Sequence, residues 1–371
     1  MRHHLARVLG AALLAALSTV TVITPADAAT STATTLDEQQ DLRQQCEQQH
    51  ATEAATAQGW LKSRFESCHR IHQDLLLTKK GTLQVVGTIK FDEWILGFSY
   101  DGSRRVDYIA SIENMFFTAD PGYDPKTWRL EQNFRYDLAP PQIGSITPAG
   151  ATRRSELTGV WNSVPQWTVT YTSPDDGAPP PPSVVAGTIH VDTYVDAPDT
   201  EGWHDDVDRY SKVRFDTAGA IVGKARGAVF TDFKVVIPFS LNPAAGFPQA
   251  ARHYDDALHH PVTTFPSVVG KNVPGGTVPL HRTTNTGTQD ANTREAVKTC
   301  KDVWGPYDGQ QLNCDEYPFA TTREGAAVGD GQYSARLIDA TDNQNAGRWL
   351  SSGYINNRII DGDAFYIAIT P

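Results

Sequence analysis

"SVVAGTIHVDTYV", residues 183–195, is rich in β-branched residues and alternates polar and apolar side chains over residues 188–192. A period of two residues is typical of a β-strand that buries one of its faces. Comparable runs, rich in β-branched and aromatic residues and separated by Gly, Pro and Asp clusters, lie on both sides of it at 82–91, 105–117, 167–171 and 227–239. Several short strands at this spacing predict a β-rich module, resembling a sandwich or a barrel, over residues 79–243.

The segment before this module has a different composition. Residues 29–37 are rich in Thr and Ala, which predicts a disordered start. From Asp37 to about Leu77 the chain is rich in Gln, Glu and Ala and contains few helix breakers. We therefore expect residues 29–78 to form a disordered start followed by one or two helices.

The segment after the module, residues 244–371, mixes helical and strand patterns. Pro248 opens a stretch with apolar residues at helical spacing. Asn292, followed three positions later by Glu295, resembles a capping box that begins a second helix. Two strand-like runs follow at 333–338 and 364–369. The chain as a whole is thus predicted to be α+β, with an N-terminal helical segment, a β-rich sandwich-like module and a small C-terminal α+β domain.

The first 28 residues have the pattern of a secretory signal peptide. Arg2 and Arg7 precede a mostly apolar run, Leu9–Val22, and small residues at positions 26 and 28 mark a cleavage site after Ala28. The apolar run is too short for a membrane anchor, and no later segment is apolar for long enough. We expect a secreted, extracellular protein without membrane association.

Four cysteines fit two disulfide bonds in an exported protein. Three pairings are possible; the short separation within each pair favours Cys46–Cys68 and Cys300–Cys314. A four-cysteine zinc site would need C-x-x-C spacing, which the sequence lacks.

The formal charge of −11 argues against a protein that coats nucleic acid by bulk electrostatics. It does not exclude an enzyme that binds one phosphate locally. From residue 247 onward, ten Lys and Arg stand against fourteen Asp and Glu, a net charge of −4. If this part of the chain acts on DNA, we expect weak substrate binding with a steep salt dependence, or help from the β-rich module.

"NCDEYPFATTREGA", residues 313–326, sets Asp315 and Glu316 side by side among Tyr, Pro and Phe. Two adjacent carboxylates at the edge of an apolar layer are costly unless a cation satisfies them. A divalent ion suits such oxygen ligands. The alternatives are that Asp315 caps a strand and that Glu316 pairs with Arg323. A third carboxylate, Glu324, follows eight residues after Glu316.

Five blocks in the C-terminal third resemble, in order, the motifs of the NucA/NucB family of secreted bacterial deoxyribonucleases. The most specific is Asp315-Glu316-Tyr317-Pro318-Phe319-Ala320 with Glu324-Gly325-Ala326. The other four are a Pro-x-x-x-x-His helix at 248–257 containing His253, the segment 292–296, the segment Asp342–Gly347 and the segment Asp361–Phe365. The resemblance covers about the last third of the chain and does not extend to the β-rich module.

The resemblance implies metal-dependent cleavage of DNA phosphodiesters with little sequence specificity. On this hypothesis Asp315 and Glu316 bind one Mg²⁺ or Mn²⁺, or one of them binds it while the other activates water, and Glu324 is a further ligand. His253 is the candidate general acid–base. The remaining assignments are phosphate binding by Arg282 and Arg294, and ordering of a loop over the metal by Asn343.

Two other function classes remain open at this level. The chain could be a non-enzymatic secreted protein with a decayed nuclease domain, whose β-rich module binds cell-wall glycan or a protein partner. It could also be a nuclease toxin, although the signal peptide favours simple export. His253 could equally be a core histidine, and Arg282 a surface residue.

Overall fold

The computed structural model describes residues 34–174 and 183–371. The expected signal peptide lies outside these residues, as does most of the predicted disordered start. Helices and strands combine in an α+β fold in which strands predominate, which confirms the fold class expected from the sequence. No described helix is both long enough and apolar enough to cross a lipid bilayer.

The N-terminal helices are shorter than the sequence suggested. Helix α1 (Leu36–Gln49) begins in a capping box formed by Thr35 and Glu38, and α2 (Ala51–Ala54) follows it directly. The prediction of helix up to Leu77 is wrong, because Glu66–Thr78 is the long strand β2. Buried and more exposed positions alternate over most of β2. The period of two in this burial pattern indicates a strand, although the composition of the segment favours a helix.

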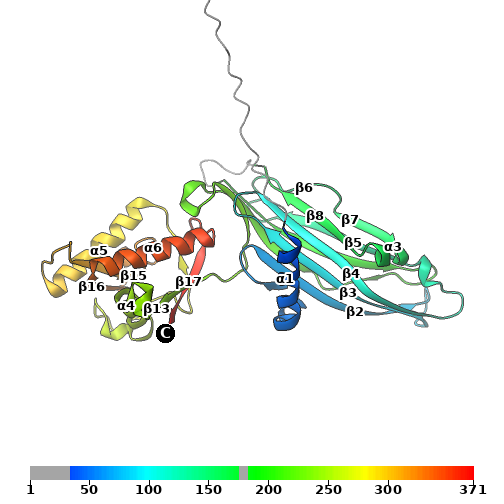
Figure 1. Ribbon diagram of the computed structural model, residues 1–371, viewed down its shortest axis with the longest axis horizontal. Coiled ribbons are helices and arrows are strands. Elements are labelled where there is room, and N and C mark those ends of the chain that lie inside the picture. The colour runs from blue at the N-terminus through cyan, green and yellow to red at the C-terminus, as the bar shows by residue number, and fades with distance from the viewer. Residues whose placement is uncertain (1–33, 175–182) are drawn as a thin grey trace, which may run out of the picture. The chain divides into compact units, whose positions relative to one another are not determined.

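Residues 60–230, which we call the two-sheet region, form two antiparallel sheets (Figure 1). The first has the order β1-β2-β3-β4-β8-β6, and the second has the order β12-β11-β9-β5-β7 with β10 paired to β9. The strands of the first sheet are β1 (Trp60–Leu61), β2, β3 (Val85–Ser99), β4 (Arg105–Ala119), β6 (Thr147–Pro148) and β8 (Gln166–Thr172). Those of the second are β5 (Arg129–Leu138), β7 (Arg153–Leu157), β9 (Ser183–Asp196), β10 (Trp203–His204), β11 (Arg209–Thr217) and β12 (Arg226–Phe230). Short helical turns are η1 (Pro125–Thr127), α3 (Thr158–Ser163) and η2 (Gly219–Val222).

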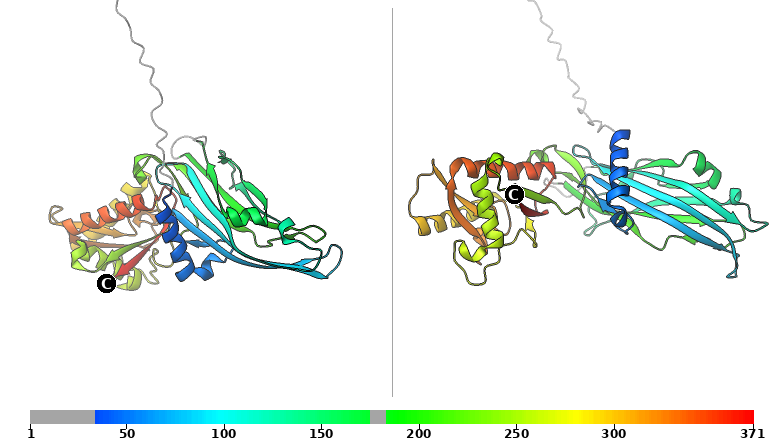
Figure 2. Two further views of the ribbon diagram at one scale, coloured as in Figure 1. Left: turned by 45° about the vertical axis from the view of Figure 1, so that its right-hand side comes forward. Right: turned by 60° about the horizontal axis from the view of Figure 1, so that its bottom comes forward.

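The two sheets share one hydrophobic core. Ile95 and Tyr108 of the first sheet lie in the same buried cluster as Phe134 of the second. The other face of the first sheet is covered by α1, because Leu42 of this helix packs with Trp94 (Figure 2). Strand β9 alternates buried with more exposed positions along its whole length, as the period-two sequence pattern predicts.

A buried carboxylate between the sheets carries a stability prediction. Glu93 is 1% exposed; its Oε1 accepts hydrogen bonds from Gln132 and Thr193, each at 2.6 Å, and its Oε2 has no partner among the described residues. Burial raises the pKa of Glu93, although the hydrogen bonds from Thr193 and Gln132 and the charge of Arg209 oppose the shift. Because its pKa is raised in the folded state, the contribution of Glu93 to the free energy of unfolding is most favourable at acid pH and is lost as the pH rises through that pKa. Glu93→Gln should therefore stabilise the protein by about 1–2 kcal/mol at pH 8 and by much less at pH 4.

Chemical denaturation of Glu93→Gln and the wild type at both pH values measures this difference. Glu156→Gln, on strand β7, is the control and should leave the pH dependence unchanged. A loss of stability in Glu93→Gln at pH 8 would show that the charged form is the one the fold stabilises.

Residues 236–371, which we call the C-terminal region, contain a second set of elements (Figure 1). Strand β13 (Val236–Ser240) pairs in parallel with β17 (Ala364–Thr370), which also pairs with β14 (Leu280–His281). β15 (Leu312–Tyr317) and β16 (Ser334–Asp339) form an antiparallel pair. β13 lies inside the segment predicted for the β-rich module, so the pairing of the C-terminal sheet begins before residue 244. The helices are α4 (Pro248–His259), α5 (Thr286–Trp304) and α6 (Ala340–Asn356), with the turns η3 (Pro243–Ala245), η4 (Pro261–Thr263) and η5 (Ala326–Val328).

Helix α5 starts earlier than its sequence suggested. Asn285 is its N-cap, and its side chain accepts a hydrogen bond from the backbone N–H of Thr288. The expected capping box at Asn292 and Glu295 is therefore wrong, because both residues lie inside the helix. Asn292 is 1% exposed and bonds to the loop 320–327 instead, a tertiary contact that the local pattern does not reveal.

The structure contains the two disulfide bonds favoured by sequence spacing. Cys46–Cys68 joins α1 to β2, and Cys300–Cys314 joins α5 to β15. The second bond lies next to the Asp315-Glu316 pair and ties the strand that carries it to the helix packed against it.

Candidate active site

A pocket of about 290 Å³ lies where β15 meets α6. Asp315 and Glu316 of β15 line it, as does Asn343 of α6. Arg282, the residue that follows β14, also lines it. The remaining lining residues are Tyr254, Cys314, Phe319, Ala320, Thr321, Ala346, Gly347, Leu350, Ser351 and Tyr354. The pocket thus combines two carboxylates, an amide and a guanidinium within a largely apolar wall.

Asp315 is held in one orientation by side chains of helix α4. It is 4% exposed; Nδ1 of His253 donates to its Oδ2 at 2.7 Å, and the hydroxyl of Tyr254 donates to its Oδ1 at 3.2 Å. Burial and the neighbouring Asp315 charge raise the pKa of Tyr254, so its hydroxyl remains a neutral donor. Both oxygens of Asp315 are therefore engaged in hydrogen bonds with side chains of α4.

His253 lies behind Asp315. Its side chain is fully buried, and its Nε2 contacts Oγ of Ser334 at 2.7 Å while Nδ1 binds Asp315. Both ring nitrogens are thus engaged, and the residue is not part of the pocket lining. In this arrangement His253 orients the carboxylate, whereas the expected general acid–base role needs a ring nitrogen that faces the substrate.

Glu316 lines the same pocket as Asp315 but contacts helix α5, whereas Asp315 contacts α4. Its Oε1 accepts a hydrogen bond from Thr293 of α5 at 3.2 Å, and its Oε2 is buried without a partner among the described residues. Burial raises the pKa of Glu316 to about 8, and the adjacent Asp315 adds to this shift. The pocket therefore contains a buried carboxylate whose charge the described side chains do not fully compensate.

Two further residues expected from the sequence lie in the same pocket. The guanidinium of Arg282 stacks over the ring of Tyr354 at 4.4 Å and donates to the carbonyl of Ile359. Asn343 lies in the first turns of helix α6 rather than in a loop. From this helix it contributes to the lining of the pocket.

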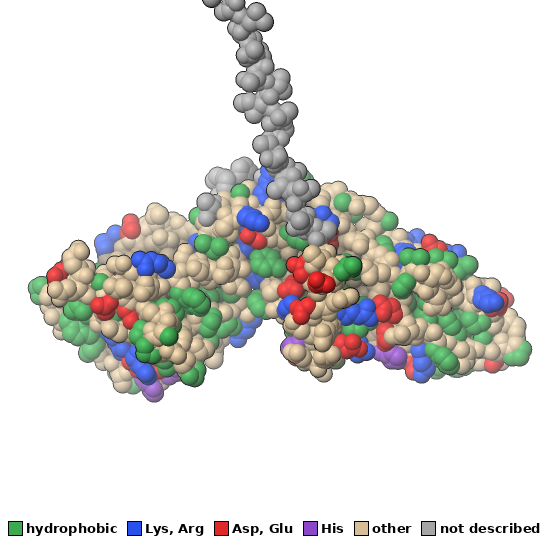
Figure 3. Space-filling model, viewed as in Figure 1, with side chains coloured by type: hydrophobic (Ala, Val, Ile, Leu, Met, Phe, Trp, Pro, Cys, Tyr) green, Lys and Arg blue, Asp and Glu red, His purple; other side chains and the backbone are tan. Residues whose placement is uncertain are grey.

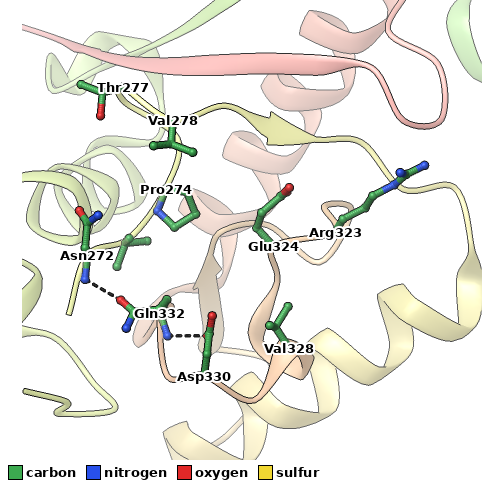
Figure 4. A pocket seen from close by; sticks show the side chains of 10 residues that line it. Asn272, Pro274, Thr277, Val278, Arg323, Glu324, Val328, Asp330 and Gln332 are labelled. Atoms are coloured by element: carbon green, nitrogen blue, oxygen red, sulfur yellow. Dashed lines mark hydrogen bonds between the residues drawn. The ribbon is translucent and has the colours of Figure 1, made fainter. Parts of the chain in front are cut away.

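Glu324 and Arg294 are not brought to this pocket. Glu324 lines a different pocket of about 420 Å³, near Pro274 and Val278 (Figure 4). Its carboxylate binds His281, accepting from Nδ1 at 2.7 Å and from the backbone N–H at 2.8 Å. Arg294 is exposed in the middle of α5, and the expected position at a helix N-terminus is wrong. No three His, Cys, Asp or Glu side chains of the described residues come together as a metal-binding group.

Sequence reasoning missed several residues that shape the site. Tyr254 and Ser334 complete the contacts of Asp315 and His253. Asp342 caps helix α4 across the fold, because its carboxylate accepts the backbone N–H groups of Gln249 and Ala250 at 3.0 and 2.9 Å. Tyr254 and Asp342 both lie inside motif segments, which was the only available signal for them.

Residues 274–368 match the family model described as Deoxyribonuclease NucA/NucB. The match includes β14, α5, β15, β16 and α6, and therefore Arg282, Asp315, Glu316 and Asn343. It ends short of the two-sheet region and of α4, which supplies His253. Neither the curated proteins nor the solved structures contain a match to this chain.

Proposed function

We propose that this protein, whose residues 274–368 carry a NucA/NucB deoxyribonuclease domain, is a secreted enzyme that hydrolyses DNA phosphodiester bonds. The hydrolysis is metal-dependent and has little sequence specificity. The observation that carries the proposal is the pocket lined mostly by the matched segment, whose wall contains both a buried carboxylate with an unpartnered oxygen, Glu316, and an arginine, Arg282. Two disulfide bonds are compatible with an extracellular location.

The pocket residues fit a divalent cation. Oε2 of Glu316 is a buried acceptor without a donor among the described residues, and the pKa of this carboxyl, about 8, reflects a charge in need of compensation. Asn343 adds an amide to the same pocket, and Asp315 retains lone pairs beyond its two hydrogen bonds. Oxygen donors of this kind suit Mg²⁺ or Mn²⁺. When bound, such an ion would polarise the phosphate and offset the charge on the leaving oxygen.

The side chains of the pocket have separable roles in this proposal. Asp315, fixed by His253 and Tyr254, accepts the proton of the attacking water through the carboxylate that faces the pocket. Arg282 donates to a nonbridging phosphate oxygen through the N–H groups that its carbonyl contacts leave free. Phosphate contacts carry no sequence information, which accounts for low specificity.

The charge of the C-terminal region predicts how binding responds to salt. On the face shown in Figure 3, Lys and Arg side chains are scattered among Asp and Glu. Substrate binding then depends on a few local contacts such as that of Arg282. We expect weak DNA binding that added salt weakens further.

A plasmid-nicking assay tests the proposed function. The protein purified in EDTA should leave supercoiled plasmid intact, and added Mg²⁺ or Mn²⁺ should produce nicked and then linear DNA. The metal-dependent rate should exceed the EDTA rate by at least about a hundredfold. Equal rates with and without metal would reject metal dependence, and no cleavage with either ion would reject the enzyme. The same assay on RNA determines the nucleic-acid preference.

A further inference from the structure

Arg282, the arginine of the pocket, is held by groups from two separate parts of the chain. Nη1 donates to the carbonyl of Ile359, in the segment after α6, and Nη2 donates to the carbonyl of Ile221 in turn η2 at 3.3 Å. The backbone N–H of Arg282 donates to the carbonyl of Asp363 at 3.0 Å. The direction of this guanidinium therefore depends on segment 358–363 and on the two-sheet region.

Arg358, at the start of this segment, is anchored entirely in the two-sheet region. Its side chain is fully buried, and its Nη2 and Nε donate to both carboxylate oxygens of Asp216 at 2.6 and 3.2 Å. Nη1 donates to Asp101 at 2.7 Å and to the carbonyl of Lys224 at 2.8 Å. Such a bidentate, buried ion pair fixes both partners in position.

The end of the segment is anchored by two more arginines of the two-sheet region. Arg214 donates to both oxygens of Asp363 at 2.6 Å, and Arg64 donates to Oδ2 of the same carboxylate at 2.8 Å. Arg64 and Arg214 also donate to the backbone carbonyl of Arg358. The attraction of these arginines lowers the pKa of Asp363 against the effect of burial.

The backbone of the two-sheet region is shaped to admit Arg358. A Cβ atom at Gly227 would lie 2.1 Å from Nε of Arg358, so only glycine leaves room for the guanidinium. Arg358 itself adopts a φ of 46°, in the left-handed region that residues other than glycine rarely occupy. The ion-pair network thus outweighs a local backbone preference in order to hold the segment.

We propose that the two-sheet region positions the active site of the C-terminal region. The buried pair Asp216–Arg358 fixes segment 358–363, whose Ile359 carbonyl, together with that of Ile221, aims Arg282 at the substrate phosphate. Asp216 and Arg358 are positioning residues, because they act through Arg282 and do not line the pocket. This inference rests on the proposed function and gives the two-sheet region a role in catalysis.

A double-mutant cycle on the full chain tests the coupling between Asp216 and Arg282. Asp216→Asn should lower kcat/KM for plasmid cleavage about tenfold and raise the inhibition constant of inorganic phosphate by a similar factor. Arg282→Met should have a larger effect, and the double variant should be no worse than Arg282→Met alone. Additive losses in the double variant would overturn the proposal, because they would show that Asp216 acts independently of Arg282.

Asp205→Asn is the matched control. Asp205 also pairs with a buried arginine of the two-sheet region, Arg209, at 2.7 Å, but this pair has no contact with segment 358–363. This variant should lose thermal stability yet keep the wild-type inhibition constant for phosphate. If it matches Asp216→Asn in that constant, the effect is one of general stability and the proposal fails.

Two further measurements keep the test decisive. If Asp216→Asn does not fold, Asp101→Asn, at the more exposed partner of Arg358, should raise the phosphate inhibition constant about threefold. If the wild type does not cleave DNA, the proposed function fails, and phosphorus NMR titration of inorganic phosphate still tests the inference. Weaker phosphate binding in Asp216→Asn than in Asp205→Asn supports positioning of Arg282, and equal binding overturns it.

Discussion

Asp315→Asn is expected to lower the rate of plasmid cleavage by about a thousandfold or more. In the wild type, His253 and Tyr254 each donate a hydrogen bond to one oxygen of Asp315. An amide offers one acceptor and one donor group, so one of the two contacts is lost or the ring of His253 must change its tautomer. The variant also removes the negative charge that the proposed proton transfer requires.

Glu316→Gln is the companion variant and should lose activity to a similar extent. It keeps the shape of the side chain and replaces a carboxyl whose pKa burial raises to about 8, so at and above pH 8, where this carboxyl ionises, the metal-free variant should be at least as stable as the wild type. Loss of cleavage activity without loss of thermal stability would show that Glu316 takes part in catalysis. Steady-state cleavage rates and thermal melts of the same preparations provide both values.

Asp255→Asn is the control for both variants. Asp255 lies on α4 like His253, but it forms surface pairs with Arg252 and His259 and does not line the pocket. Its cleavage rate should equal that of the wild type. Wild-type activity in Asp315→Asn or in Glu316→Gln would remove the corresponding carboxylate from the proposed mechanism.

Asn292→Ala is expected to destabilise the C-terminal region by about 3 kcal/mol. The amide of Asn292 donates to the carbonyls of Ala320 and Thr322 at 2.9 and 3.0 Å and accepts the N–H of Ala327 at 3.0 Å. Alanine leaves these three backbone groups without partners in a buried position, and each contributes to the loss. Loop 320–327 should then become mobile, and because Ala320 and Thr321 line the pocket, cleavage should also slow.

Urea denaturation measures the loss, and Asn285→Ala provides the comparison. Asn285 caps the N-terminus of the same helix by accepting hydrogen bonds from the backbone N–H and the hydroxyl of Thr288, only one of which satisfies a backbone group, so its removal should cost only about 1 kcal/mol. If the two variants lose the same stability, the contacts of Asn292 with the loop contribute nothing beyond an ordinary helix cap.

Patterns local in sequence predicted much of the fold. The run at 183–195 became strand β9, the run at 105–117 became β4, and the run at 82–91 became the first half of β3, which continues to Ser99. Cysteine spacing predicted both disulfide bonds. The segment 66–78 was missed, because its Gln- and Glu-containing composition masked an alternation that becomes favourable only when β3 pairs with it.

The sequence predicted only part of the candidate active site, because a motif identifies neighbouring residues but does not show where the chain carries each of them. The motif around Asp315 and Glu316 identified the strand, and Arg282 and Asn343 do share its pocket. Glu324 lies in the same motif but binds His281 in another pocket, because the chain turns between the two positions. Spacing along the chain did not indicate this separation.

The sequence by itself determined which segments alternate, which cysteines are close enough to pair and which motif carries the acidic residues, since each of these is a property of neighbouring residues. Only the tertiary structure decided that His253 is enclosed behind Asp315, that Asn292 hydrogen-bonds to loop 320–327, and that the side chain of Arg358 packs against the backbone at Gly227. These outcomes depend on burial and on partners remote in sequence, because a polar group withdrawn from water takes whichever donor or acceptor the packed fold places within reach.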